Sequence, residues 1–97
     1  MKIRHADRRL ERLETVADDG GRFDPAIVRA FRKRMQFLRA APDERALYAM
    51  KSLHYEKLKG IRSHERSLRL NDQWRLIVQI HDAGERIVVI MAIEDYH

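Results

Sequence analysis

The chain has 97 residues, of which 44% are hydrophobic and 36% are charged. This length fits one domain, and the composition is that of a globular protein rather than a disordered one. The sequence contains no cysteine, which excludes disulfide bonds and thiolate zinc sites, and it has no apolar run long enough to span a membrane. We therefore expect a single soluble domain over residues 1–97, located in the cytoplasm, with no signal peptide.

The charge balance is strongly basic. Twenty Lys and Arg residues oppose 15 Asp and Glu, for a net charge of +5, and fifteen of the basic residues are arginines. Guanidinium groups offer a planar fork of donors that matches phosphate oxygens. The balance favours nucleic acid or an acidic protein as a partner, and a solvated basic surface is the alternative.

The first half of the chain predicts a short strand and two helices. Residues 1–5 fit a strand. Asp7 can cap a first helix, whose apolar side has helical spacing and which ends at the acidic and glycine residues 18–21. The apolar positions of this helix are Leu10, Leu13 and Val16.

The second helix has clearer boundaries. Asp24 can cap it, Pro25 fits its first position, and Pro42 ends it. One apolar stripe follows the helical period and predicts the buried side of this helix. Its members are Ile27, Phe31, Met35 and Leu38.

Residues 42–62 fit a short helical turn followed by a loop, and after Gly60 the apolar period changes from helical to alternating. The alternation predicts two strands joined by a turn at Asn71 and Asp72, and residues 86–94 form a third, apolar on both faces and so inside the sheet. The result is an α+β fold, with a short N-terminal strand and two helices packed on an antiparallel sheet of about four strands.

Within this hairpin, Arg69 and Arg75 are predicted to share one face. If Leu68 and Leu76 face the helices, the two arginines point the other way and are cross-strand neighbours. Like charges this close repel, so the arrangement favours an anionic ligand such as a phosphate. The alternative is a pair of exposed arginines that protect a sheet edge from aggregation.

Further polar groups accompany this pair. Residues 54–66 are rich in basic side chains, and the chain ends in the acid, phenol and imidazole of residues 95–97. Cleavage of RNA without a metal needs a base for the 2′-hydroxyl, cations for the transition state and an acid for the 5′-oxygen, which His and Arg can supply. Neither a histidine metal motif nor a phosphate-binding glycine loop is present, so we expect no metal and no cofactor.

Two motifs together resemble a known family. The segment "LKGIRSHERSLRLNDQWRLIVQI" and the final "IEDYH" resemble the HigB-type toxins of the RelE superfamily, small bacterial toxins of type II toxin–antitoxin pairs. The resemblance extends over the whole chain. It implies a fold like that of microbial ribonucleases and a ribosome-dependent mRNA endoribonuclease, which cuts messages in the ribosomal A site and halts translation.

The resemblance also implies site residues and partners. Arg69 and Arg75 would hold the scissile phosphate, and His97 would transfer protons. Tyr96 would orient the phosphate or stack on a base. Asp95 would tune the proton transfer by His97 or position the 2′-hydroxyl. The partners would be the ribosome with its mRNA and a helix-turn-helix antitoxin of the HigA type. The remaining expected residues are Lys57 at the phosphate and, as RNA or ribosome contacts, His54, Lys59, Arg62, Arg66 and Asn71.

The sequence departs from the family pattern at Glu56, where many relatives carry a histidine; the nearest upstream histidine is His54. The choice between Lys57 and Lys59 at the phosphate therefore stays open. Two other functions also remain. A ParE-like toxin of the same superfamily would inhibit gyrase without an RNA-cleaving set of residues, and a non-catalytic RNA-binding module would tolerate the loss of His97.

Overall fold

The structure is a computed structural model that describes residues 1–16, 23–82 and 84–95. Its helices, short 3₁₀ turns (η) and strands are β1 Lys2–His5, α1 Arg8–Thr15, α2 Pro25–Ala40, α3 Glu44–Ala49, η1 Lys51–Leu53, β2 Glu56–Lys57, η2 Gly60–Arg62, β3 Glu65–Arg69, β4 Trp74–Asp82 and β5 Arg86–Asp95. None of the described helices is long and apolar enough to cross a membrane.

The strands form one mixed sheet in the order β1-β5-β4-β3-β2. Strands β3, β4 and β5 make the predicted antiparallel meander, and the α+β class is confirmed. The sheet has five strands rather than about four, because β2 adds antiparallel to β3. It is mixed rather than antiparallel, because β1 pairs in parallel with β5.

Side-chain caps fix the starts of α1 and α2, as predicted. Asp7 accepts a hydrogen bond from the Arg9 backbone N–H at 2.7 Å, and Asp24 accepts one from Ala26 at 2.8 Å. Helix α2 begins at Pro25 and ends at Ala40, shortly before Pro42. Helix α1 ends at Thr15, and Val16 after it is extended, so the helix stops before residues 18–21, where the sequence predicted its end; those residues themselves lie outside the described ones.

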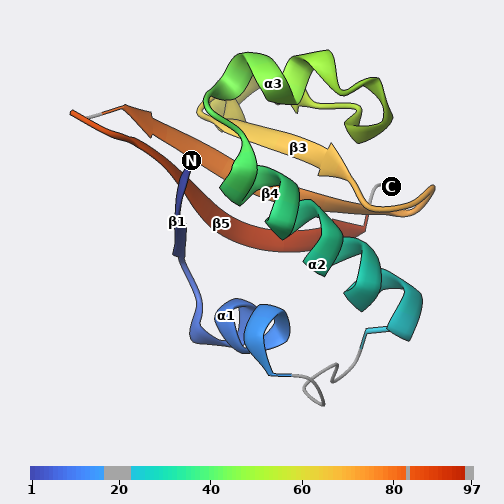
Figure 1. The fold of residues 1–97 in the computed structure, drawn as a ribbon. Helices are drawn as coiled ribbons and strands as arrows, with labels where there is room; N and C mark the ends of the chain where they lie inside the picture. Colours follow the sequence, from blue (N-terminus) through green and yellow to red (C-terminus); the bar gives the residue numbers. More distant parts are fainter. Residues whose placement is uncertain (17–22, 83, 96–97) are drawn as a thin grey trace.

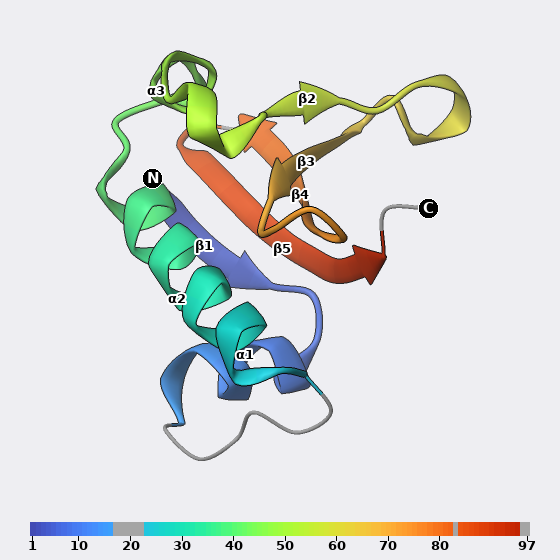
Figure 2. The same ribbon diagram turned by 90° about the vertical axis from the view of Figure 1, so that its right-hand side faces the viewer.

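Both long helices pack on the same side of the sheet (Figure 1; Figure 2). The predicted stripe of α2 is buried, as are Leu10 and Leu13 of α1, whereas Val16 is exposed. Strand residues at alternating positions complete the core from the sheet side. They include Leu68, Leu76, Val78, Val88 and Ile90.

Strand β5 is interior, as predicted, but it is buried on only one face. Val88 and Ile90 are fully buried, whereas the alternating residues Val89 and Met91 are partly exposed. The reason is that α1 and α2 cover only one face of the sheet (Figure 2). The second face carries neither of these helices, although Ser67 and Ile77 on it are buried, and it is the face on which we look for a functional site.

Candidate active site

A row of three charged side chains crosses the uncovered face of the sheet. Arg69 of β3 lies directly opposite Arg75 of β4, and Arg75 lies directly opposite Glu94 of β5. Directly opposite residues in antiparallel strands share a face. The neighbouring pair Leu68 and Leu76 is fully buried against the helices, so the charged row lies on the other face, as the sequence predicted for the arginines.

The alternative that these arginines protect a sheet edge does not explain Arg75. Strand β4 lies between β3 and β5, in the interior of the sheet, and β3 itself is flanked by β2 at Arg66 and Ser67. Edge protection needs a strand whose backbone groups are open to another chain. Arg75 therefore needs another explanation, whereas Arg69 lies beyond the two residues of β3 that pair with β2.

The turn at Asn71 holds the two arginines in register. Its side-chain oxygen accepts hydrogen bonds from the backbone N–H groups of Gln73 and Trp74, both at 2.8 Å. An Asn at this place mimics a backbone turn and favours a tight connection. Asn71, expected as an RNA contact, thus uses its oxygen within the turn.

Among the described residues, His54, Asp72 and Arg34 contact Arg69. Its Nη1 atom lies 3.4 Å from Nε2 of His54, and its Nη2 atom donates to the carboxylate of Asp72. From α2, the Nε atom of Arg34 donates to the backbone oxygen of Arg69 at 3.0 Å. Burial, and then the nearby charge of Arg69, lower the pKa of Arg34. The structure thus places His54, expected as an RNA or ribosome contact, beside Arg69, and it adds Arg34, which the sequence did not single out.

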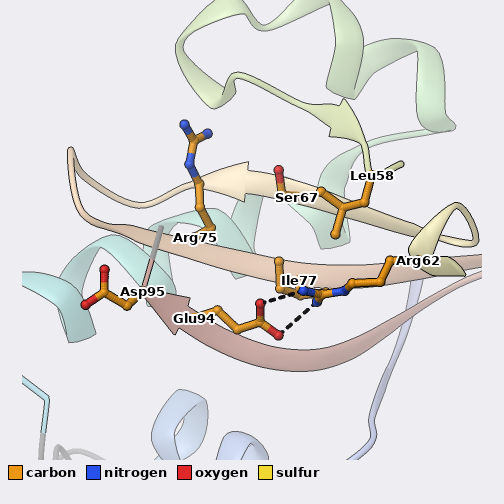
Figure 3. Close-up of a pocket in the computed structure, with 7 residues that line it drawn as sticks. All are labelled: Leu58, Arg62, Ser67, Arg75, Ile77, Glu94 and Asp95. Carbon is orange, nitrogen blue, oxygen red and sulfur yellow. Dashed lines mark hydrogen bonds and ion pairs between the residues drawn. The ribbon is translucent and has the colours of Figure 1, made fainter. Parts of the chain in front are cut away.

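A pocket of about 370 Å³ adjoins Arg75 on the same face. Apolar side chains of Leu58 and Ile77 line it together with charged groups from β4, β5 and the η2 turn (Figure 3). The full lining is Leu58, Arg62, Ser67, Arg75, Ile77, Glu94 and Asp95. The pocket therefore combines an apolar surface with charges of both signs next to a phosphate-binding candidate.

Arg62 forms one wall of this pocket through ion pairs. Its two terminal nitrogens donate to the two oxygens of Glu94 at 3.0 and 2.9 Å, and its Nε donates to Glu65 at 2.7 Å. These hydrogen bonds, first those with Glu94 and then those with Glu65, raise the pKa of Arg62. The side chain predicted to contact RNA is thus engaged within the protein.

Arg66 also has a partner inside the protein. Its Nε donates to Glu44 of α3 at 3.1 Å, and the same carboxylate accepts from the hydroxyl of Tyr55 at 2.8 Å. Burial and then the hydrogen bond to Glu44 raise the pKa of Tyr55. Arg66 therefore ties α3 to β3, on the helix-covered side of the sheet.

The register of strand β2 places Lys57, the expected phosphate contact, on the opposite face of the sheet from Arg69 and Arg75. Lys57 lies opposite Arg66, which lies opposite the fully buried Val78, so this row faces the helices. Glu56 instead lies opposite Ser67, a residue of the pocket. Lys59 is exposed just before η2. Register thus brings Glu56, rather than Lys57, to the face of Arg69 and Arg75.

Asp95 reaches the pocket from the end of β5. It lies opposite Trp74, and its carboxylate accepts a hydrogen bond from the Gln73 side chain at 3.0 Å. Tyr96 and His97 lie outside the described residues, so their predicted roles stay predictions. In the described part of the chain, no group of three or more His, Cys, Asp and Glu residues is arranged to hold a metal ion.

Comparisons with known proteins agree with this architecture. Residues 4–97 match a family model described as the RelE-like toxin of type II toxin–antitoxin system HigB. No curated protein sequence matches the chain. Among solved structures, a YoeB/ParE toxin from Agrobacterium tumefaciens is similar over 100% of both chains, with a TM-score of 0.63 and 15% identity. At that identity the likeness shows the fold alone.

Proposed function

We propose that this chain, which belongs to the HigB family of RelE-like toxins of type II toxin–antitoxin systems, is a metal-independent endoribonuclease that cuts mRNA on the ribosome. Toxins of the RelE-like family are generally nucleases. The observation that carries the proposal is the in-register pair of Arg69 and Arg75 beside the pocket on the uncovered sheet face. Two facing cations supply a site for the scissile phosphate.

The charges suit attack by the 2′-hydroxyl on the adjacent phosphate. A base takes the 2′ proton, the 2′ oxygen bonds to phosphorus, and the bond from phosphorus to the 5′-oxygen breaks. Arg69 and Arg75 would stabilise the additional negative charge of the transition state. Glu56, on the same face, is a candidate base, and His97 remains the candidate acid that protonates the 5′-oxygen. Asp95 would orient His97, and Tyr96 would stack on a base.

The family implies an antitoxin partner, and we propose that it is a helix-turn-helix protein of the HigA type. Ribosome dependence is supported by the net charge of +5, because arginine-rich surfaces bind ribosomal RNA phosphates. Lys59 and His54 remain the exposed candidates for such contacts.

The test incubates the purified protein with a defined mRNA, with and without programmed ribosomes, and maps the cut ends. We expect cuts in A-site codons only when ribosomes are present, and their loss in Arg75→Ala and His97→Ala. Attack by the 2′-hydroxyl leaves a 2′,3′-cyclic phosphate and a 5′-hydroxyl, whereas metal-activated water leaves a 5′-phosphate or a 3′-phosphate without the cyclic form. A 2′-O-methyl group at the cut site should therefore abolish cleavage.

Folded protein that cuts no message in either condition would overturn the nuclease proposal. Inhibition of gyrase supercoiling by the same preparation would then support the ParE-like alternative. Unchanged toxicity of His97→Ala, with weakened RNA binding by Arg69→Ala, would instead support a non-catalytic RNA-binding module.

A further inference from the structure

Arg75 has an acidic residue as its direct neighbour across the sheet. Glu94 lies opposite it on β5, on the same face and in the same row as Arg69. An ionised carboxylate beside a phosphate-binding guanidinium competes with the phosphate for the same donors and repels the phosphate charge. A nuclease site built on Arg75 therefore has to keep this carboxylate occupied.

Arg62 meets this requirement. It holds both oxygens of Glu94 with its two terminal nitrogens, a bidentate geometry that fixes the direction of the carboxylate. A third hydrogen bond, from Nε to Glu65, anchors Arg62 to β3. Figure 3 shows the carboxylate of Glu94 turned toward Arg62, while the guanidinium of Arg75 points in a different direction.

The local backbone explains how Arg62 reaches this place. Gly60 begins the η2 turn with a φ of +68°, a left-handed conformation that glycine adopts without strain. The turn returns the chain over the sheet, so that a residue 32 positions before Glu94 meets it. The side chain of the intervening Ile61 is 95% exposed, so the ion pairs of Arg62, and not an apolar contact of its neighbour, hold the turn to β5.

From this geometry we infer that Arg62 is a positioning residue, which holds the carboxylate of Glu94 away from Arg75 so that Glu94 does not compete with the scissile phosphate at Arg75. The inference rests on the proposed nuclease function. It differs from a direct RNA contact by Arg62, because Arg62 would act only through Glu94. It also differs from a purely structural ion pair, because the cost of losing Arg62 would depend on the charge of Glu94.

The experiment compares Arg62→Ala, Glu94→Gln and the double variant Arg62→Ala/Glu94→Gln for cleavage on programmed ribosomes. We expect Arg62→Ala to lower kcat/KM by about tenfold or more, since an unpaired carboxylate now faces Arg75. The kcat/KM of the double variant should recover to within about threefold of wild type. Glu94→Gln alone should match or exceed wild type, because the neutral amide does not repel phosphate. Glu65→Gln is the matched control: it removes the other partner of Arg62 but leaves Glu94 held, so cleavage should persist.

Two further measurements separate the roles. The slope of ribosome affinity against salt concentration, on logarithmic scales, should fall in Arg62→Ala by about the amount expected for one lost phosphate contact. In the double variant the slope should return to the wild-type value. The melting temperature should be lower in both variants that lack Arg62. The double variant should therefore recover cleavage without recovering stability. Arg9→Ala, which removes an exposed ion pair on α1, controls for the lost charge.

Cleavage by Arg62→Ala at the wild-type rate, or a double variant as impaired as Arg62→Ala, would overturn the inference while leaving the nuclease proposal intact. Absence of cleavage by the wild-type protein would instead overturn the proposed function. If Arg62→Ala unfolds below the assay temperature, Arg62→Gln in the same two backgrounds gives the same comparison.

Discussion

Arg69 and Arg75 face each other directly across β3 and β4, and His54 and Asp72 contact Arg69. Facing like charges cost about 0.2–1 kcal/mol of stability in a sheet. The exposed pair of Arg69 with Asp72 returns only about 0–1 kcal/mol. The facing arginines therefore add little stability, and in the proposed nuclease they would serve to bind the phosphate.

Arg69→Gln should separate these two effects. Cleavage should fall about 10²–10³-fold, because a donor to the transition state is lost. The melting temperature should stay equal or rise, because the repulsion with Arg75 is gone. Activity assays and thermal unfolding of the same preparations test this. Arg45→Gln, at an exposed ion pair on α3, removes the same charge and should change neither. A fall in stability that parallels the loss of activity would contradict the prediction.

Glu56 and Lys57 are adjacent residues that register places on opposite faces of the sheet. Glu56→Gln should lower cleavage by about 10²-fold or more if the carboxylate takes the 2′ proton. Lys57→Gln, on the face of Arg66, should retain most of the activity. Single-turnover cleavage on programmed ribosomes measures both. The reverse result would return the phosphate contact to Lys57, as first expected from the sequence.

Asn71 is predicted to act through the turn rather than through RNA. Asn71→Ala removes an acceptor of two backbone N–H groups and should lower the free energy of unfolding by about 1–3 kcal/mol. Asn71→Asp keeps the acceptor oxygen and should retain most of that stability. Urea unfolding of the three proteins makes the comparison. Equal stability of all three, with loss of RNA binding in both variants, would favour the direct RNA contact.

The sequence predicts those parts of the fold that local patterns determine. The alternation around Leu68 and Leu76 fixes the faces of the hairpin, and Asp7 and Asp24 mark the helix starts through their own hydrogen bonds. Strand β2 escapes such prediction, because two residues carry no alternation and pair only when β3 is present. Its absence from the sequence-based fold also left the faces of Glu56 and Lys57 undetermined.

Contacts between residues far apart in the sequence account for most of what was missed in the site. Arg34 is one of many basic residues on α2, and only the packing of α2 brings it to the backbone oxygen of Arg69, 35 positions later. Arg62 and Arg66 have the charge expected of RNA contacts. Whether such a side chain meets a phosphate or an internal carboxylate depends on tertiary structure, and here both meet carboxylates.

A last prediction concerns a cluster of ionic side chains between β1, α1 and α2. The carboxylate of Glu14 is only 12% exposed and contacts Nε2 of His5 at 2.8 Å and two nitrogens of Arg39 at 2.9 Å. Burial alone raises the pKa of Glu14, but the hydrogen bonds and charges of Arg39 and His5 outweigh burial and lower it below its ordinary value of 4.5.

Because the pKa of Glu14 is lower in the folded protein, its ionised form contributes stability that is fully present above the unfolded pKa of 4.5 and is lost as the pH falls through the folded pKa. Glu14→Gln should therefore lower the free energy of unfolding by about 1–3 kcal/mol at pH 7, and the difference from wild type should shrink as the pH falls below 4.5. Urea unfolding at pH 7, 5 and 3 measures it, with Glu11→Gln, exposed on the same helix, as the control. A difference that stays constant from pH 7 to pH 3 would show that Glu14 stabilises the fold by packing rather than by its charge.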